Sequence, residues 1–562
     1  MIAAAAAITR LPAHWTPLGD NALVELWTRA VGSSSTPLVG GDARFGWNHL
    51  GPWVFYLLAL PYRLLGSSAV GLLVGAAAIN IVTLVAVMRC VRAVAGRGAA
   101  AVIAAGALLF FITATGDRLI DPWNPFVVQM PFLLAVVACW AVVNRLWFWC
   151  AWLVGAASLC VQSHIAFLAP AAVLVAIGGV ALWRAPQGER RRPLVRTAVV
   201  AVIAWTPTAI DLFLPHRHNL YRVVKYFAQS SPSATAGVST GLRVVLRETG
   251  LRASWLGGRV GVHLFTAGFD GGVGVLPGIG LVALVLVGLL AHRRRDSVIR
   301  SLALLLGVLL VVAVAEMSSA RGELYPYLFG WVTIVGMLCW AAAICGAVRM
   351  IPVAGLDERL PWLTVAASLG LLAAGVGSIT PRSPLERAGD DAIVRRLVAQ
   401  VEPALQRGRR YRLQHGEDAF SSIYEHGLVN ALRGDGYPVV VDPLAAVLFG
   451  HQLTDPNAAA YPTLAVVAPY EATPPGWTVI GLSDPLTTAE RAHEAELVST
   501  LCSAYAQTAN KVASDIVRTA DGNLVLVALL VDSDPSHGPL LQDLAALRSR
   551  GRSIAVELQT QP

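Results

Sequence analysis

Long apolar runs separated by short polar loops make up the chain as far as about residue 378. A helix needs about 20 predominantly apolar residues to cross the hydrocarbon core of a bilayer. Runs that approach this length lie at residues 68–88, 98–115, 125–143, 146–162, 166–183, 197–213, 273–291, 301–316, 328–348 and 360–378. The pattern predicts a polytopic α-helical membrane protein with about 10–11 transmembrane helices.

Arginine occurs in every second loop between these runs. Cytoplasmic loops of membrane proteins carry an excess of Lys and Arg, so we assign to the cytoplasm the loops that contain Arg89, Arg92, Arg97, Arg145, Arg184, Arg190, Arg293, Arg295 and Arg349. The alternation then places outside the cytoplasm residues 10–67, 116–124, 163–165, 214–272, 317–327 and everything after residue 378.

The apolar N-terminal segment, residues 1–8, is too short to span, because its helix would rise only about 12 Å against about 30 Å of hydrocarbon. We favour the end of a longer first helix; a short interfacial segment is the alternative. A cleaved signal peptide is a poorer interpretation, because no basic residue precedes the stretch and no small-residue cleavage site follows it.

Charge runs and loop-spaced Pro and Gly begin after residue 378. Helix-like segments at 391–405, 419–432, 489–509 and 540–548 alternate with β-branched runs at 437–441, 463–467, 477–480 and 524–531. This order predicts a soluble α/β domain over residues 379–562, after a transmembrane module over residues 1–378. The domain shows no Gly-rich phosphate loop, paired His ligands or nucleophile elbow, so we interpret it as a binding or assembly module.

Composition agrees with a membrane protein: 55% of the residues are hydrophobic, 14% are charged and the mean hydropathy is +0.60. The net charge of +8 comes almost entirely from arginine, since Lys225 and Lys511 are the only lysines. We attribute it to inside-facing loops and expect no nucleic-acid partner. Six of the seven cysteines fall in apolar runs and Cys502 stands alone, so no disulfide framework or metal-ligand spacing is present.

The first outside loop carries the polar residues of most interest. Gly19-Asp20-Asn21 and Gly41-Asp42 place two carboxylates outside the bundle, and Glu25 is expected to face water on a short helix. An aromatic, apolar segment follows at residues 53–66, too interrupted to span and suited to the membrane interface. The loop therefore combines acidic groups with a lipid-facing platform.

Asn48-His49-Leu50-Gly51-Pro52 and the Tyr-Leu-Leu-Ala-Leu-Pro run at 56–61 resemble the GT-C superfamily of membrane glycosyltransferases, in which a first-loop acid precedes such a segment. Leu50 replaces the first proline of the family pattern. The turn at 121–125 and Gln162-Ser163-His164 are similar to actinobacterial members. The resemblance covers roughly residues 10–378. It implies a plasma-membrane enzyme that moves a sugar from a polyprenyl-phosphate donor to an extracytoplasmic cell-envelope glycan, lipid or protein acceptor, with arabinofuranose first and mannose second as the sugar.

The resemblance also implies residue roles. Asp20 matches the first-loop acid and is our candidate general base; a turn or helix-cap aspartate is the alternative. Asp42 is a second candidate, as an acceptor-binding carboxylate or a ligand for a divalent cation, Mg or Mn, and a plain turn explains it equally well. Asn48 and His49 are candidates for sugar or phosphate binding, although a His beside Trp47 is also typical of a membrane anchor.

Positive charge for the donor phosphate is expected from the long outside loop. It supplies Arg217, Arg222 and Lys225, interleaved with tyrosines, and Arg can bind phosphate through two parallel hydrogen bonds. Solvated charge near lipid headgroups is the alternative for each. Further substrate-binding candidates at outside helix ends are Arg321, His164 and Asp121.

A transporter or lipid-linked-sugar flippase is the main competing function, and a scaffold without activity is a third. Transporters typically show internal repeats and ionisable or broken positions at the membrane midplane. The apolar runs here contain almost no central charge and no repeat of halves, whereas the conspicuous acids lie in one outside loop. The enzyme is therefore favoured.

Overall fold

The computed structural model describes residues 15–43, 45–113, 119–214, 219–229, 235–257, 272–321, 324–350, 389–416, 419–467, 473–507, 513–514, 517, 534, 536–550 and 553–560. Two compact units make up the chain. One contains residues 1–15 and 27–381, and the other contains residues 16–26 and 382–562. A short segment of the first loop therefore belongs with the C-terminal residues.

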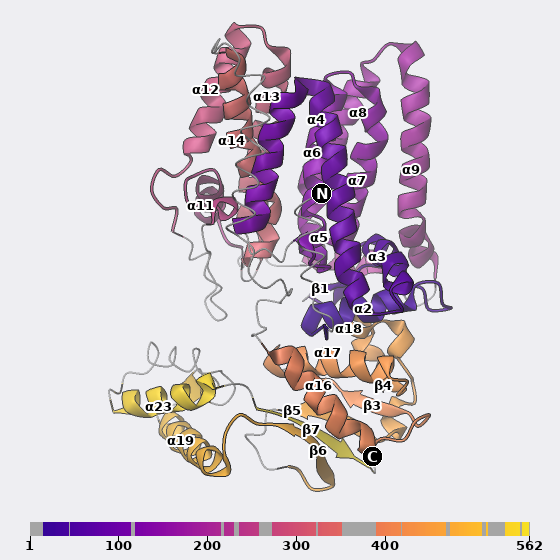
Figure 1. The fold of residues 1–562 in the computed structure, drawn as a ribbon, viewed down its shortest axis with the longest axis vertical. Coiled ribbons are helices and arrows are strands. Elements are labelled where there is room, and N and C mark those ends of the chain that lie inside the picture. Colours follow the sequence, from indigo (N-terminus) through magenta and orange to yellow (C-terminus); the bar gives the residue numbers. More distant parts are fainter. Residues whose placement is uncertain are drawn as a thin grey trace. The chain divides into compact units, whose positions relative to one another are not determined.

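A bundle of apolar helices forms the first unit, and its members run side by side (Figure 1). They are α4 (Val70–Thr113), α6 (Gln129–Val143), α7 (Cys150–Ser163), α8 (Leu168–Trp183), α9 (Gln187–Phe213), α12 (Ile279–Arg293), α13 (Ser297–Ser319) and α14 (Gly330–Met350). Within the described ranges, six helices are long and apolar enough to cross a membrane, and three apolar helices are shorter. The predicted multi-pass α-helical membrane fold is confirmed.

Two of the predicted spans are joined in α4, which is interrupted at Gly96, where φ is +90° and the backbone is not helical. Only glycine adopts such a φ without strain, so residues 70–95 and 97–113 are two helical segments meeting at a kink. The predicted span at 360–378 lies outside the described residues. Each remaining span overlaps a helix, although α9 begins ten residues before the predicted 197–213 and α12 begins six residues after the start of the predicted 273–291.

Burial separates the helices at the centre of the bundle from those at its edge. Helix α6 is buried from Gln129 to Val142, whereas α9 buries only Pro207 and Asp211. A helix that is apolar on all sides is stable only inside a protein or in lipid. The exposed apolar surface of α9 is therefore the surface expected to face lipid, and α6 forms the core, where Phe132 packs edge-on against Phe167 and Trp331.

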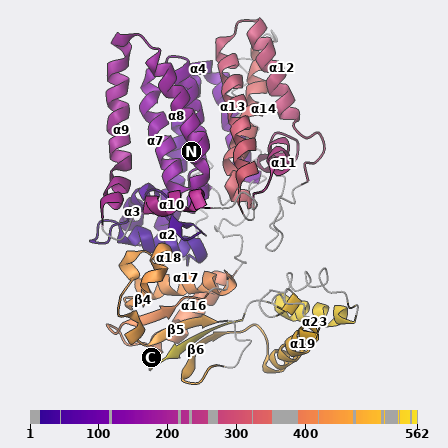
Figure 2. The ribbon, with the colours of Figure 1, turned by 180° about the vertical axis from the view of Figure 1, so that it is seen from behind.

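Shorter elements close the ends of the bundle. They are the hairpin β1 (Asp42–Ala43) and β2 (Trp47–Asn48), α3 (Trp53–Leu64), the four-residue α5 (Asn124–Val127), α10 (Asn219–Gln229) and α11 (Val238–Glu248). Helix α3 is too short to span at about 1.5 Å per residue, as predicted, and it exposes Leu57, Leu60 and Leu64. Figure 2 shows α10 lying across the ends of the bundle helices.

The second unit is built on a five-stranded mixed sheet with the order β4-β3-β5-β7-β6. Its strands are β3 (Tyr411–Gln414), β4 (Val439–Val441), β5 (Thr463–Val467), β6 (Trp477–Ser483) and β7 (Ile554–Gln559). Strand β3 pairs in parallel with β4 and β5, whereas β7 pairs antiparallel with β5 and β6. Helices α16 (Asp390–Val401) and α17 (Ala419–Gly434) cover one face (Figure 1). The predicted α/β character is confirmed; β3 and β7 were missed, and 524–531 lies outside the described residues.

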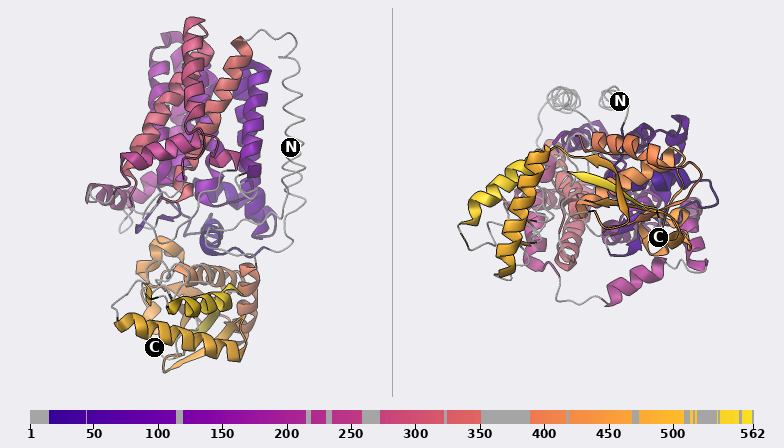
Figure 3. Two further views of the ribbon diagram at one scale, coloured as in Figure 1. Left: turned by 90° about the vertical axis from the view of Figure 1, so that its left-hand side faces the viewer. Right: turned by 90° about the horizontal axis from the view of Figure 1, so that it is seen from below.

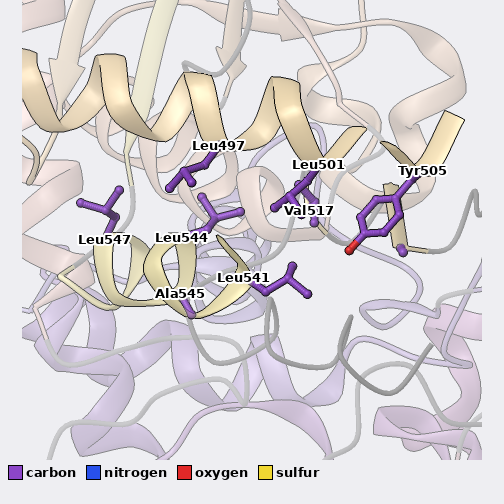
Figure 4. Close-up of a cluster of buried hydrophobic side chains, with 9 residues drawn as sticks. Leu497, Leu501, Tyr505, Val517, Leu541, Leu544, Ala545 and Leu547 are labelled. Atoms are coloured by element: carbon purple, nitrogen blue, oxygen red, sulfur yellow. The ribbon is translucent and has the colours of Figure 1, made fainter. Parts of the chain in front are cut away.

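A second helical layer lies to one side of the sheet, formed by α19 (Thr488–Gln507) and α23 (His537–Ser549) (Figure 3). Leu497 and Leu501 of α19 pack against Leu541 and Leu544 of α23 in a buried cluster (Figure 4). Beside it, Nε of the buried Arg548 donates to Glu494 at 2.7 Å. The pair lets α19 and α23 approach without leaving a buried charge unpaired.

We expect Gly336→Ala in α14 to destabilise the bundle by about 1–3 kcal/mol, the usual cost of overpacking. A Cβ atom there would lie 2.1 Å from the carbonyl oxygen of Glu248, which is backbone and cannot move aside. Gly307→Ala in α13 is the matched control, because nothing lies within 4 Å of its Cβ position. Thermal unfolding in detergent measures both; equal melting temperatures would contradict the close approach of α11 and α14.

Candidate functional site

The candidate site begins with the hairpin that follows the first loop. Asp42 pairs with Asn48 and Ala43 with Trp47 in an antiparallel register. The pairing continues beyond the strands, since His49 N–H donates to the Gly41 carbonyl at 2.8 Å. The hairpin therefore holds Asn48 and His49 in fixed positions, and both are buried.

Gly51 lets the chain after the hairpin pass directly against α7. Its N–H donates to the Gln162 carbonyl at 3.1 Å, and a Cβ at this position would lie 2.0 Å from the Gln162 side-chain oxygen. The Gln162 amide nitrogen donates in turn to the Ala204 carbonyl of α9 at 2.7 Å. A larger residue than Gly51 would therefore have to displace the Gln162 side chain and its bond to Ala204.

Asn219, the first residue of α10, ties that helix to the hairpin. Its side-chain oxygen accepts from Asn48 N–H at 2.9 Å, and its side-chain nitrogen donates to the Asn48 carbonyl at 2.7 Å. The Asn219 N–H donates to Asp211 Oδ2 at 3.2 Å. All three residues are buried, so these bonds satisfy polar groups that water does not reach.

Two histidines face each other at the centre of this region. The rings of His49 and His164 lie 4.6 Å apart. Nδ1 of His49 accepts from the Ile165 N–H at 3.2 Å, and Nδ1 of His164 accepts from the Ala166 N–H at 3.3 Å. An accepting Nδ1 on a neutral ring leaves the proton on Nε2. Burial, and then the neighbouring His164, lower the pKa of His49 well below its ordinary value of 6.5.

Aromatic side chains surround the histidine pair. Tyr327 packs edge-on against His164 at 5.8 Å and against Trp123 at 5.0 Å, and it stacks on Tyr325 at 5.6 Å. Trp47 lies edge-on to His49 at 5.7 Å. The pair is therefore placed in a largely apolar setting in which neutral N–H donors are stronger than in water.

Arg321 lies against the aromatic face of α10. Its guanidinium carbon is 5.8 Å from the Tyr226 ring centre and 5.9 Å from that of Phe227. Tyr226 also stacks on Phe45 at 4.7 Å and packs against Trp47. The structure thus brings Arg321 together with the hairpin and α10, which the sequence had assigned to three separate outside loops.

Other predicted site residues have different surroundings. Asp121 is buried, and its Oδ1 accepts from the Trp123 N–H at 2.9 Å, so one of its oxygens stabilises the turn. Asp42 is half-buried in β1, and Arg222 and Lys225 are exposed on α10. Arg217 lies outside the described residues.

Asp20 lies in the first turn of α2 (Gly19–Ala30) and is half-buried. It belongs to the segment 16–26 that packs with the C-terminal residues. Glu25 does not face water, contrary to the prediction: it is 5% exposed and accepts from the Asn430 side chain at 2.7 Å. The prediction was wrong because it treated this helix as isolated, whereas α17 covers one side of it.

Sequence reasoning missed Asn219, Asp211 and Tyr327 as members of the site. Each stands in a loop or helix end far along the chain from His49, and no motif connects them. Asp211 alone has a weak signal in the sequence, because an acidic residue at the end of an otherwise apolar run often has a function. Among the described residues, Asp42 is not part of any group of three or more His, Cys, Asp or Glu side chains arranged to hold a metal.

No protein-family model and no curated protein sequence matches the chain. Among solved structures, ArnT from Cupriavidus metallidurans bound to undecaprenyl phosphate has a TM-score of 0.51 at 14% identity, over 83% of this chain and 92% of ArnT. Its apo form has a TM-score of 0.50 at 14% identity, over 83% and 91%. An oligosaccharyltransferase from Archaeoglobus fulgidus in complex with Zn and sulfate aligns with a TM-score of 0.44 at 10% identity, over 99% and 88%.

The likeness to ArnT concerns the fold, because 14% identity is too low to carry residue roles. It extends over both the helical bundle and the sheet-containing C-terminal residues. ArnT belongs to the GT-C superfamily. The chain therefore has a GT-C-like fold, as the motifs of the first loop and its hairpin suggested.

We expect His49 to make the folded protein acid-sensitive. Because its folded pKa lies below 6.5, the unfolded state binds the proton first. Above about pH 6.5 this group does not lower the free energy of unfolding. At lower pH the free energy of unfolding decreases by about 1.4 kcal/mol per pH unit, until the pH reaches the folded pKa. Melting temperatures between pH 7.5 and 5 check this. His49→Gln keeps an acceptor for the Ile165 N–H and should melt with a flatter pH dependence; an unchanged slope would contradict the assignment.

Proposed function

We propose that the protein is a membrane glycosyltransferase that transfers a sugar from a polyprenyl-phosphate donor to an acceptor of the cell envelope. The observation that carries this proposal is the shared fold with ArnT, a protein crystallised with undecaprenyl phosphate. The polar site supports it, since hydrogen-bond donors and a cation gather where the apolar helices end. A polyprenyl-phosphate sugar has the matching chemistry, with a tail soluble in lipid and a polar head.

The reaction is a displacement at the anomeric carbon. A bond forms from the acceptor oxygen to that carbon, the bond from the carbon to the phosphate oxygen breaks, and the acceptor proton passes to a base. We assign Asp20 as the base, on the resemblance of its loop to the superfamily pattern, with Asp42 as the alternative. The departing phosphate keeps the bonding electrons and is stabilised by positive charge and by N–H donors.

For that phosphate we propose Arg321, together with Arg222 and Lys225 on α10. Helix α10 exposes Tyr221, Val224 and Phe227 beside its two cations, a composition typical of helices that lie in the membrane interface. Such a helix would hold cations at the depth of a lipid phosphate. The Nε2–H groups of His49 and His164 are neutral donors for sugar or phosphate oxygens, and Arg217 is a further candidate.

The sugar and the acceptor follow from resemblance alone. The similarity of the turn at 121–125 and of Gln162-Ser163-His164 to actinobacterial members favours arabinofuranose from a decaprenyl-phosphate carrier, with mannose second. The acceptor would be a cell-envelope glycan, lipid or protein. A flippase without transferase activity is the competing function. Its movement of the lipid-linked sugar would not depend on a general base at Asp20.

Asp20→Asn is expected to lower sugar transfer by about 10²- to 10⁴-fold, the usual contribution of a general base. Asn keeps the size and turn propensity of Asp but takes no proton at neutral pH. Transfer of labelled sugar from a synthetic polyprenyl-phosphate donor, assayed with purified protein, measures the loss. Asp435→Asn is the control, because Asp435 is an exposed turn aspartate.

Retention of more than about a tenth of wild-type turnover by Asp20→Asn, which is well short of that range, would reject this residue as the base. Asp42→Asn would then be the variant to lose activity. If neither variant changes a measurable transfer, the first-loop acids are structural. If the wild-type protein transfers no sugar but moves the lipid-linked sugar across vesicles, the flippase is correct.

We propose that the chain after residue 378 lies outside the cytoplasm, because the alternation of arginine-containing loops puts it on that side. Leu444 is 95% exposed, so Leu444→Cys in a Cys502→Ser background should react with a membrane-impermeant thiol reagent in intact cells. The six other cysteines are buried and should stay unlabelled. If the Leu444→Cys variant reacts with the reagent only after the membrane is opened, the proposed topology is wrong.

A further inference from the structure

The C-terminal residues bring together three side chains with the chemistry of metal ligands. His415 follows β3, and Glu425 and His426 are consecutive in α17. Their ligand atoms all lie within 4.8 Å of one another, and within the described residues they are the one group of this kind. We propose that His415, Glu425 and His426 bind a divalent transition-metal ion of the zinc class, independently of the proposed sugar transfer.

The spacing of the ligand atoms suits a single ion. Nδ1 of His415 lies 2.5 Å from Oε1 of Glu425, and the remaining pairs fall within the 4.8 Å limit. Zinc binds imidazole nitrogen and carboxylate oxygen at about 2.0–2.2 Å, so tetrahedral ligands lie roughly 3.3 Å apart. His415 stands in a loop and is 36% exposed, which gives it the freedom to move by the required fraction of an ångström.

The surroundings of His426 are the strongest evidence for a bound metal ion. The residue is 6% exposed, and neither of its buried ring nitrogens makes a hydrogen bond of good geometry. A neutral imidazole nitrogen carries the lone pair that a metal ion binds. A buried polar group without a partner is costly, and a bound ion would supply the partner.

Glu425 is already oriented for such a role. Its side chain is fully buried, and its second oxygen, Oε2, accepts from the Gly416 N–H at 3.1 Å. Hydrogen bonds of this kind fix metal-binding carboxylates. Phe449 packs edge-on against both rings, at 5.9 Å from His415 and 5.4 Å from His426, and shields the group on that side.

The ligand types decide between classes of ion. Two imidazoles and one carboxylate suit zinc and its neighbours in the transition series, whereas Mg²⁺ and Ca²⁺ require more oxygen ligands. Three protein ligands leave a fourth position, on the exposed side of His415, for water or another donor. A simple ion pair of His415 with Glu425 is the competing account, but it gives no role to the buried His426 ring beside the pair.

The position of this group in the fold gives the ion a structural consequence. Helix α17 carries two of the ligands and, one turn later, Asn430, which donates to Glu25. The same unit contains residues 16–26. Binding of an ion would tie α17 to the loop after β3 and so strengthen the helix on which the first-loop segment packs.

The test uses the full-length protein purified in detergent, stripped with EDTA and reloaded with Zn²⁺ or Co²⁺. We expect about one ion per chain by elemental analysis, visible d–d absorption with Co²⁺, a higher melting temperature with Zn²⁺, and no displacement by millimolar Mg²⁺. His415→Gln and Glu425→Gln should weaken Zn²⁺ binding by about tenfold or more, since even outer partners of such ligands have effects of this size.

His493→Gln is the matched control, because His493 is an exposed histidine of the same unit that pairs with Asp543 at 2.8 Å. It should bind Zn²⁺ as the wild type does. The His415 variant changes a partly exposed side chain, so its fold can be checked by its metal-free melting temperature. Absence of Zn²⁺ binding in the wild type, or equal affinity in the His415 and His493 variants, would overturn the proposal. Neither result bears on sugar transfer.

Discussion

The need to satisfy polar groups where apolar helices end is the constraint on which this structure most depends. In hydrocarbon, backbone groups are paired within helices, but at the helix ends the chain must turn and water is largely excluded. An unpaired group buried there costs roughly 1–3 kcal/mol. The hairpin, the reciprocal bonds between Asn48 and Asn219, and the acceptance of an N–H by His49 and His164 all meet this requirement. The same bonds position the site.

The C-terminal unit depends on the first loop in a similar way. Residues 16–26 pack with it, and the bond from Asn430 to Glu25 pairs two buried polar side chains. Asp20 therefore lies in a segment that packs against residues far along the chain, since Asn430 and Glu25 are 405 positions apart. The C-terminal unit therefore helps to form the start of α2.

The likeness to ArnT shows how little sequence identity a membrane fold requires. At 14% identity the two chains share their architecture over most of both lengths, because a helix in lipid needs apolar character more than particular side chains. Chemistry is more demanding, since it depends on a few groups in fixed geometry. The likeness therefore concerns the architecture, and the chemistry depends on residues that fold likeness does not carry.

Sequence alone located the apolar helices of the described bundle, because long apolar runs are what hydrocarbon requires, and it predicted the α/β character of the C-terminal residues. It also singled out His49 and His164, but not their contact. Tertiary structure decided what surrounds them: Asn219, Tyr327 and Arg321 come from separate loops, and no local pattern predicts which helix ends meet. For the same reason Glu25 was wrongly expected to face water. The sequence also gave no sign that His415, Glu425 and His426 lie together, and paired histidine ligands were not expected there. Local periodicity determines which face is apolar, whereas long-range packing determines which polar groups share a site.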